Sequence, residues 1–137
     1  MALFSIFDIA GSSMSAQSVR LNTTASNLAN ATNVASDAAS AYRGKHPIFE
    51  TIMSELGSGA PSAGVSVRQI VESQLDAPRV FDPGHPMADT DGFIYLSNVN
   101  VMNEMVDMIS ASRAYQNSVE VLNTSKQLML RTLAIGQ

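Results

Sequence analysis

The side chains most capable of chemistry gather in one turn-rich stretch of the sequence. Five residues are of types that ligate metal ions: Asp82, His85, Asp89 and Asp91 in this stretch, and His46 outside it. The stretch Asp76–Gly92 also contains three prolines and two glycines, and turns use Asp, Pro and Gly for backbone reasons. Aligning Asp91 and Gly92 with the fifth and sixth positions of a calcium-binding EF-hand loop puts Met87 first and Asn98 twelfth, and neither is a suitable ligand. We expect a loop here, with no metal and no cofactor.

Catalysis by a nucleophile has equally little support. The sequence has no cysteine, which excludes thiol chemistry, disulfides and Cys-based zinc sites. Ser58, in "GSG", lacks the strand–turn–helix context of a hydrolase nucleophile, and only two histidines are available as a base. No phosphate-binding or dinucleotide-binding glycine loop occurs. We therefore expect no enzyme activity and no small-molecule substrate.

The charge pattern and the first residues exclude further classes. The net charge is −4 and only 15 % of residues are charged, so no basic patch indicates a nucleic-acid partner. The N-terminal "MALFSIFDIAGSSMSAQSV" has no basic region, and Asp8 interrupts its short apolar run, so it is not expected to be a cleaved secretory signal. No segment approaches the roughly 20 apolar residues of a membrane span.

The N-terminal segment has the seven-residue spacing of a helix that packs on another helix. One row of this heptad is large and apolar: Phe7, Met14, Leu21 and Leu28. Its companion row is small or polar: Ala10, Gln17, Thr24 and Ala31. Arg20 is the only charge between Asp8 and Asp37, so charged pairs along the helix cannot support it alone. Its stability must come from packing against another element.

The C-terminal segment is the expected partner of this helix. It carries two heptad rows, the first being Met105, Ser112, Val119, Lys126 and Leu133 and the second Met108, Tyr115, Leu122 and Met129. Further apolar residues flank these rows: Val106, Ile109, Val121 and Leu128. The helix is predicted from about Met102 to Ala134, roughly 50 Å at 1.5 Å per residue, with Gly136 as a natural stop. The wide apolar surface predicts contact with more than one neighbour.

Between the helices the texture changes. Gly57–Gly64, "GSGAPSAG", has the composition of a flexible turn or linker. Val65–Val71 and Gly92–Leu96 are candidate strands. We predict a mainly α fold, with long N- and C-terminal helices paired as an antiparallel coiled coil and a small irregular or β-containing middle module. The three segments are residues 1–36, 37–97 and 98–137.

Two stretches resemble a known family. "ASNLANATN", residues 25–33, is similar to the N-terminal signature of the bacterial flagellar rod and hook proteins. Residues 82–133, with "HPMAD", "NVNVMNEMVDMI", "ASRAYQ" and "VLNTSKQLMLRTL", resemble the C-terminal part of the rod proteins. The sequence departs from the family pattern in three places: a longer Ala/Ser stretch leads to Tyr42-Arg43-Gly44, Phe93-Ile94 replace a more usual Tyr-Val, and Ser97 replaces a usual proline.

The resemblance implies a structural subunit of the proximal rod of the flagellar basal body, polymerising through its terminal helices into a hollow, torque-transmitting tube. It implies these partners: copies of itself, other rod proteins, ring and junction proteins of the basal body, and the flagellar type III export apparatus. It also implies a location in the periplasm-spanning rod, reached without cleavage of the N-terminus. Family motif positions expected at assembly contacts are Asn27, Leu28, Ala29, Asn30, Asn98, Asn100, Glu104, Arg113, Tyr115 and Gln116. From the heptad rows we add Phe7, Met14, Leu21, Met105, Met108, Val119, Leu122 and Met129.

Two other classes remain alternatives. A coiled-coil adaptor that forms a soluble dimer would share the two helices, but coiled-coil flanks usually carry Glu and Lys, which the N-terminal helix lacks. A peptidoglycan-cutting enzyme would need a further domain with a carboxylate pair or metal site, for which 137 residues leave no room beside two long helices.

Overall fold

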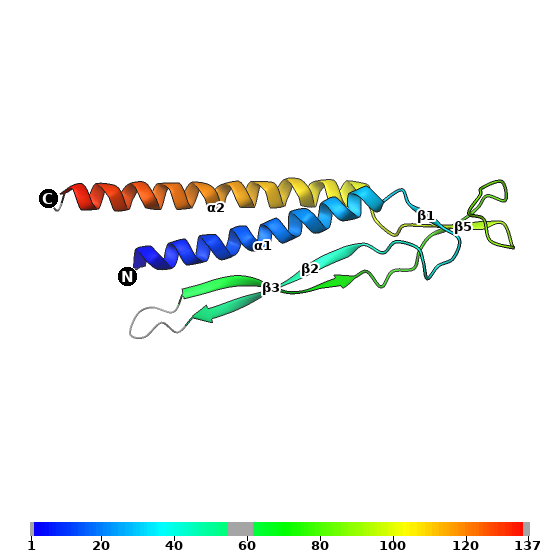
Figure 1. Cartoon of the computed structure of the whole chain (residues 1–137), viewed down its shortest axis with the longest axis horizontal. Helices are drawn as coiled ribbons and strands as arrows, with labels where there is room; N and C mark the ends of the chain where they lie inside the picture. The colour runs from blue at the N-terminus through cyan, green and yellow to red at the C-terminus, as the bar shows by residue number, and fades with distance from the viewer. Residues whose placement is uncertain (1, 55–61, 136–137) are drawn as a thin grey trace.

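Two long helices lie side by side and run in opposite directions along the molecule (Figure 1). The structure, a computed structural model, describes residues 2–54 and 62–135. Helix α1 spans Ala2–Asn30 and helix α2 spans Val101–Ile135. Asn100 caps α2, because its side-chain Oδ1 accepts a hydrogen bond from the Asn103 amide at 3.2 Å. The two helices contact each other along their length.

A long hairpin covers the other side of α1. Strands β2 (Lys45–Ser54) and β3 (Ser62–Glu72) pair antiparallel, with an irregularity between Ile48 and Phe49. Both strands contact α1, whereas no Cα atom of α2 approaches the described part of the hairpin within 8 Å. The layers therefore run α2, α1, hairpin, with α1 in the middle (Figure 1).

A second, smaller sheet forms the end of the molecule away from the chain termini (Figure 1). Its strand order is β1-β5-β4, made of Val34–Ala35, Phe93–Leu96 and Arg79–Phe81, and both pairings are antiparallel. The chain turns into β5 at Gly92. Its φ of 78° lies in a region that residues with a Cβ rarely adopt. A Cβ there would also lie 3.0 Å from the Phe81 ring. The rings of Phe81 and Phe93 meet edge to face with centroids 5.2 Å apart.

Most sequence-based expectations for the elements are confirmed. The C-terminal helix was predicted within one residue at each end, and both candidate strands are present in β3 and β5. Strand β2 was not predicted. Part of the expected linker, 62–64, belongs to β3, while residues 55–61, including Ser58, lie outside the described residues, as does Gly136.

The described core is made of small side chains. Its buried apolar residues are mostly alanine: Ala10, Ala16, Ala35, Ala41, Ile94 and Ala111. Seven polar or charged residues are buried as well: Thr23, Thr24, Asn27, Ser97, Glu104, Ser118 and Ser125. Large apolar side chains are consequently concentrated outside this core.

No helix in the described part of the chain is long and apolar enough to span a membrane.

Candidate assembly site

The contact between α1 and α2 is built from small residues spaced seven apart. On α2 the buried row is Glu104, Ala111, Ser118 and Ser125. The predicted row that begins at Met105 lies one residue further on, and Met105, Lys126 and Leu133 are exposed. Ala111 is 0 % exposed, so α1 approaches α2 closely at this point. Small side chains permit this approach because they leave room for the facing helix.

Polar contacts join the two helices across this seam. The Ser13 and Ser118 hydroxyls lie 3.1 Å apart, and Ser118 donates to the Ala114 carbonyl at 3.0 Å. The Arg20 guanidinium forms an ion pair with Asp107. From the Ser13–Ser118 contact to the Arg20–Asp107 ion pair, the residue number rises on α1 and falls on α2, as expected for helices that run in opposite directions.

Two acceptors in the same seam are left without a partner. Among the described buried side chains, Gln17 Oε1 and Glu104 Oε2 have no hydrogen-bond partner. A buried polar atom without a partner reduces stability, by about 1–3 kcal/mol in mutational series. The seam is therefore specific in its contacts but not fully satisfied.

Asn27, from the N-L-A-N motif, anchors α1 to the start of the hairpin. Its side chain is 0 % exposed. The amide Nδ2 donates to the Lys45 carbonyl at 2.8 Å, and Oδ1 accepts from the Lys45 amide at 2.8 Å and from the Tyr42 hydroxyl at 3.1 Å. Asn27 thus pairs with Lys45 as a neighbouring strand residue would.

Asn98 makes the matching contact from the other side. Its Oδ1 accepts from the Gly44 amide at 2.8 Å, and its Nδ2 donates to the Leu75 carbonyl at 2.7 Å. We call Asn27 and Asn98 together the asparagine clamp. The clamp fixes the Gly44–Lys45 segment between the two helix ends. Asparagine suits both positions because one side chain can donate and accept at once.

The second asparagine of the motif closes the end of α1. Asn30 Nδ2 donates to the Ser26 carbonyl at 2.8 Å, and Asn30 Oδ1 accepts from Asn33 at 2.8 Å. The asparagines that weaken α1 as an isolated helix therefore place its C-terminal end and the chain that follows. In the described molecule these contacts are intramolecular, and they explain why asparagines stand in this helix.

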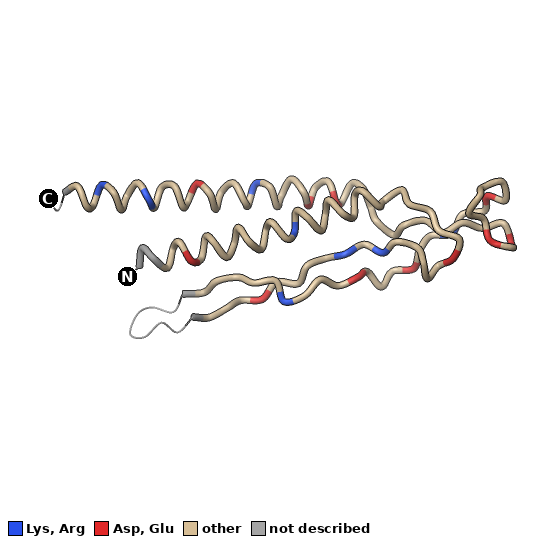
Figure 2. Tube along the Cα trace, viewed as in Figure 1, with Lys and Arg blue, Asp and Glu red and all other residues tan. Residues whose placement is uncertain are grey.

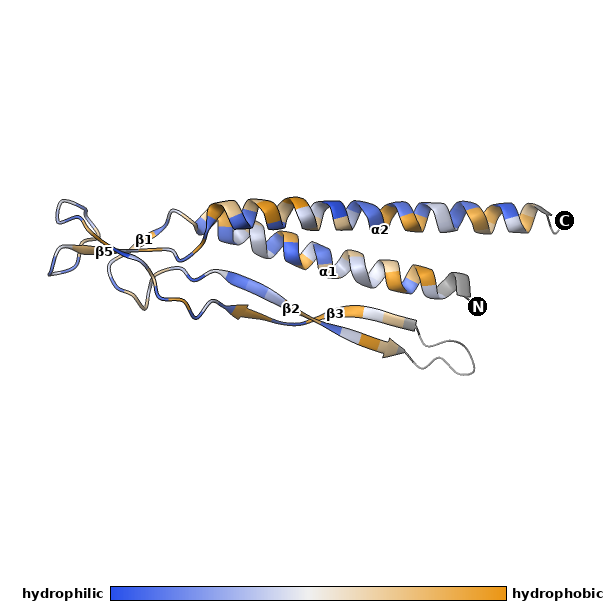
Figure 3. Ribbon diagram, turned by 180° about the vertical axis from the view of Figure 1, so that it is seen from behind, coloured by the Kyte–Doolittle hydropathy of each residue, from blue (hydrophilic) through white to orange (hydrophobic). Residues whose placement is uncertain are grey.

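Helix α2 also presents a large apolar surface to solvent, which we call the outer face of α2: Met102, Met105, Val106 and Ile109. Their exposed fractions are 72 %, 45 %, 66 % and 56 %. Helical spacing puts them on one side of the first two turns, roughly opposite the buried row. Further apolar residues are exposed towards the C-terminal end of the helix: Val121, Leu128, Leu130 and Leu133. Figure 3 shows that hydrophobic residues recur along the whole of α2.

The remaining residues expected at assembly contacts take three kinds of position. Half-buried ones are Phe7, Met14, Leu21, Leu28, Met108, Tyr115, Val119, Leu122 and Met129. Exposed ones are Ala29, Asn100, Arg113 and Gln116. Only Asn27 and Glu104 are buried. Most of these residues lie on α1 or α2. The asparagines lie together where α1 ends and α2 begins.

Several residues that carry these contacts were not expected from the sequence. Ser13 and Ser118 bridge the helices, Ala111 sets their close approach, and Tyr42 completes the bonds of Asn27. The available signal was a further heptad row of small residues, Ala111, Ser118 and Ser125, which lies beside the apolar rows. Small residues at that spacing indicate a closely packed helix face.

Two of the candidate ligands in the turn-rich stretch, Asp89 and His85, are engaged in local hydrogen bonds. Asp89 Oδ1 accepts from the Asp91 and Phe93 amides, both at 2.9 Å, and His85 Nδ1 accepts from the Met87 amide at 3.1 Å. Within residues 2–54 and 62–135 no group of three or more His, Cys, Asp or Glu side chains is placed to hold a metal ion. This stretch is organised by turn hydrogen bonds.

Comparison with known proteins defines the class. The family model described as "Flagella basal body rod protein" matches residues 7–41, and the model described as "Flagellar basal body rod FlgEFG protein C-terminal" matches residues 90–135. The two matches cover most of α1, all of α2 and both asparagines of the clamp. The chain belongs to the flagellar basal body rod protein family, a structural and not an enzymatic class.

Relatives agree over their whole length. The flagellar basal-body rod protein FlgC of Escherichia coli O6:H1 is 50 % identical over 137 residues, and that of Salmonella typhimurium is 48 % identical, in each case covering 100 % of both chains. The FlgC of Buchnera aphidicola from Acyrthosiphon pisum is 39 % identical over 139 residues, again covering 100 % of both chains. The chain is a structural rod subunit of the flagellar basal body, and nothing supports the alternative of a soluble adaptor.

Proposed function

We propose that this chain polymerises through α1 and α2 into the hollow, torque-transmitting tube of the proximal rod. Its neighbours there are copies of itself and other rod proteins, with ring and junction proteins of the basal body alongside. It reaches the periplasm-spanning rod through the flagellar type III export apparatus, with its N-terminus uncleaved. The membership of the rod protein family supports this assignment.

The observation that carries the proposal is the outer face of α2. Burying a large apolar side chain contributes about 1.5–3 kcal/mol relative to leaving it in water. Four such side chains on two turns of one helix are therefore poorly placed in an isolated subunit. In a tube they would lie between subunits, where each copy gains the same burial.

The seam supports the same arrangement of the helices. Its buried row on α2 repeats every seven residues, the spacing of helices that wind around each other as a coiled coil. We propose antiparallel coiled-coil pairing of α1 and α2 as the inner layer of the tube. The hairpin lies on the far side of α1 from α2 and is free to meet a different neighbour (Figure 1).

The test introduces a charge on the outer face. Ile109→Asp should leave the thermal unfolding of the free subunit close to wild type, because Ile109 is already 56 % exposed. It should abolish rod assembly and motility, because assembly would bury the carboxylate in an apolar contact. Both are measured in a strain that depends on this chain for motility, with circular dichroism melting of the purified subunit in parallel.

A matched control separates position from charge. Thr124→Asp introduces the same group at an exposed polar position of α2 that is not part of the outer face, and it should keep motility. Normal motility of the Ile109 variant, at normal expression, would refute the proposed assembly surface.

A further inference from the structure

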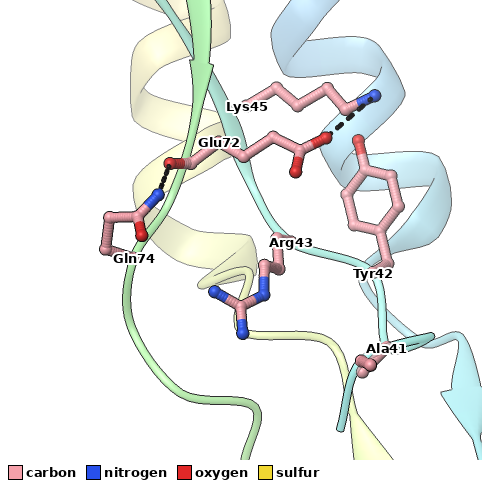
Figure 4. Close-up of a pocket in the computed structure, with 7 residues that line it drawn as sticks. Ala41, Tyr42, Arg43, Lys45, Glu72 and Gln74 are labelled. Atoms are coloured by element: carbon pink, nitrogen blue, oxygen red, sulfur yellow. Dashed lines mark hydrogen bonds and ion pairs between the residues drawn. The ribbon is translucent and has the colours of Figure 1, made fainter.

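A recess beside the asparagine clamp carries an unpaired cation. The recess has a volume of about 470 Å³ and is lined by Ala39, Ala41, Tyr42, Arg43, Lys45, Glu72 and Gln74 (Figure 4). We call it the Arg43 recess. It lies where the chain passes from the turn after β1 into β2, and β3 leaves beside it (Figure 4).

The charges of the recess do not cancel. Lys45 Nζ lies 3.7 Å from Glu72 Oε1 and 5.9 Å from the centre of the Tyr42 ring. Arg43 forms no ion pair with any described residue, and Figure 4 shows its guanidinium pointing away from the Lys45–Glu72 pair. The nearby carboxylate of Asp37 is held in its own turn, by the Ala39 amide at 2.9 Å and the Ser40 amide at 2.7 Å. The side chains that line the recess, two cationic and one anionic, carry one net positive charge.

The opposite charge is concentrated at the end of the molecule. The turns of residues 82–92, which we call the tip loop, carry Asp82, Asp89 and Asp91 and have no cation of their own (Figure 2). The adjacent Arg79 is stacked over the Phe93 ring, with its guanidinium carbon 5.0 Å from the centre. None of the three aspartates takes part in an ion pair with a described residue.

The tip loop also exposes apolar surface. Phe81, at its base, is 63 % exposed, and Met87 is 43 % exposed. The loop is held in shape by hydrogen bonds, from the Asp82 amide to the Gly92 carbonyl at 2.9 Å and from the Asp89 amide to the Phe93 carbonyl at 2.8 Å. It is thus a shaped acidic and apolar projection.

We propose that the Arg43 recess receives the tip loop of a second copy of this chain. Charge complementarity selects this occupant, because the recess is cationic and the tip loop is the acidic projection of the same chain. The inference rests on the proposed self-assembly of the subunit. Recess and tip loop are different surfaces, so the contact is head-to-tail and each copy can give one and receive one, which generates an open helical array.

The contact acts mainly through selection of a register. An exposed ion pair contributes little affinity by itself. Complementary charges nevertheless favour one juxtaposition of two surfaces over others and penalise like-charge pairings. In this account the outer face of α2 supplies apolar burial between copies, and the Arg43 recess fixes how neighbouring copies are offset along their long axes.

Cysteine cross-linking tests the contact directly, because the natural chain contains no cysteine. Cells express two variants together, Arg43→Cys and Asp91→Cys, and their assembled basal bodies are oxidised. We expect a disulfide-linked dimer from the mixture and far less from either variant alone. Absence of that excess, or a cross-link to a protein of different mass, would overturn the second copy as the occupant.

Charge reversal supplies a second measurement. Arg43→Glu should reduce motility at least about tenfold, since like charges would now meet, and adding Asp91→Arg should restore part of it. Arg68→Glu is the control, because Arg68 is an exposed arginine of β3 outside the recess. Equal motility of the Arg43 and Arg68 variants would overturn the inference, as would a failure of Asp91→Arg to restore any of it.

The result can be separated from that of the proposed function. If Ile109→Asp blocks assembly but the mixed cysteine pair gives no dimer, self-assembly through α2 stands and the recess contact falls. If Ile109→Asp has no effect, the proposed function itself fails, whatever the recess variants do.

Discussion

The two helices differ in how completely this molecule surrounds them. Helix α1 has α2 on one side and the β2–β3 hairpin on the other, and its buried residues include Ala10, Ala16, Thr23, Thr24 and Asn27. Helix α2 contacts α1 alone among these elements, and its exposed residues include the four apolar side chains of the outer face. The subunit therefore covers α1 on two sides, whereas it leaves the outer face of α2 exposed to solvent.

The difference separates two sources of stability in a protein of this class. Most buried polar and small residues of α1 pack or bond inside the chain, through the asparagine clamp and the seam, with Gln17 Oε1 as an exception. The four apolar side chains of the outer face gain little hydrophobic free energy in the isolated subunit, because most of their surface stays in water. Substitutions around α1 should therefore act on the subunit, and substitutions on the outer face should act on the assembly.

The largest expected effect on the subunit follows loss of Asn27. Asn27→Ala leaves the Lys45 amide, the Lys45 carbonyl and the Tyr42 hydroxyl without their partner. We expect the free energy of unfolding to fall by about 2–4 kcal/mol, measured by urea denaturation. Asn30→Ala, at a half-buried position, should cost less than about 1 kcal/mol. Equal losses for the two variants would show that the clamp does not anchor α1.

A somewhat smaller effect is expected from overfilling the seam. Ala111→Leu adds a branched side chain where Ala111 is 0 % exposed, so the helices must move apart. The expected cost is about 1–3 kcal/mol in free energy of unfolding. Ser110→Leu adds a similar side chain at the exposed neighbouring position and should change stability by less than about 0.5 kcal/mol. A tolerated Ala111→Leu would contradict close packing of α1 on α2.

The ion pair between the helices should contribute less. The side chains of Arg20 and Asp107 are 28 % and 42 % exposed, so solvent screens their attraction. A double-mutant cycle with Arg20→Ala and Asp107→Ala should give a coupling of about 0.2–1 kcal/mol that decreases with added salt. A coupling that is independent of salt would mean that the pair is better shielded than its exposure indicates.

The smallest effect concerns the turn after β1. Hydrogen bonds from the Ser40 amide, and then from the Ser40 hydroxyl, hold the pKa of the Asp37 carboxyl below its usual range. Because the folded pKa is lowered, the contribution of Asp37 is present above its unfolded pKa of about 3.9 and is lost as the pH falls through the folded value. Ser40→Ala should raise the pKa of Asp37 in an NMR titration. An unchanged value would remove the hydroxyl as a cause.

The sequence predicts the helices well because their signals are local. Heptad spacing lies within the element that it defines, so α2 was predicted within one residue at each end. The choice of seam was harder. The row that begins at Met105 was expected to meet α1, but the buried row is Glu104, Ala111, Ser118 and Ser125, because the closest approach of two helices is set by their small side chains.

The parts that were missed depend on distant partners. Strand β2 contains Pro47, which weakens a strand assignment, and its pairing partner β3 lies beyond residues 55–61. The role of Asn27 depends on the backbone of Lys45, 18 residues away, and on a tyrosine in the link between them. Composition shows that such an asparagine is poorly placed in an isolated helix, but not which backbone group it will meet.

The most direct test of the account is the accessibility of the outer face of α2 before and after assembly. Val106→Cys supplies a single thiol in a chain without cysteine, at a position that is 66 % exposed in the subunit. We expect rapid maleimide labelling of the purified subunit and protection of the same thiol in intact basal bodies of motile cells. Equal labelling in both would contradict this expectation, because α2 would then keep its apolar face in water within the finished rod.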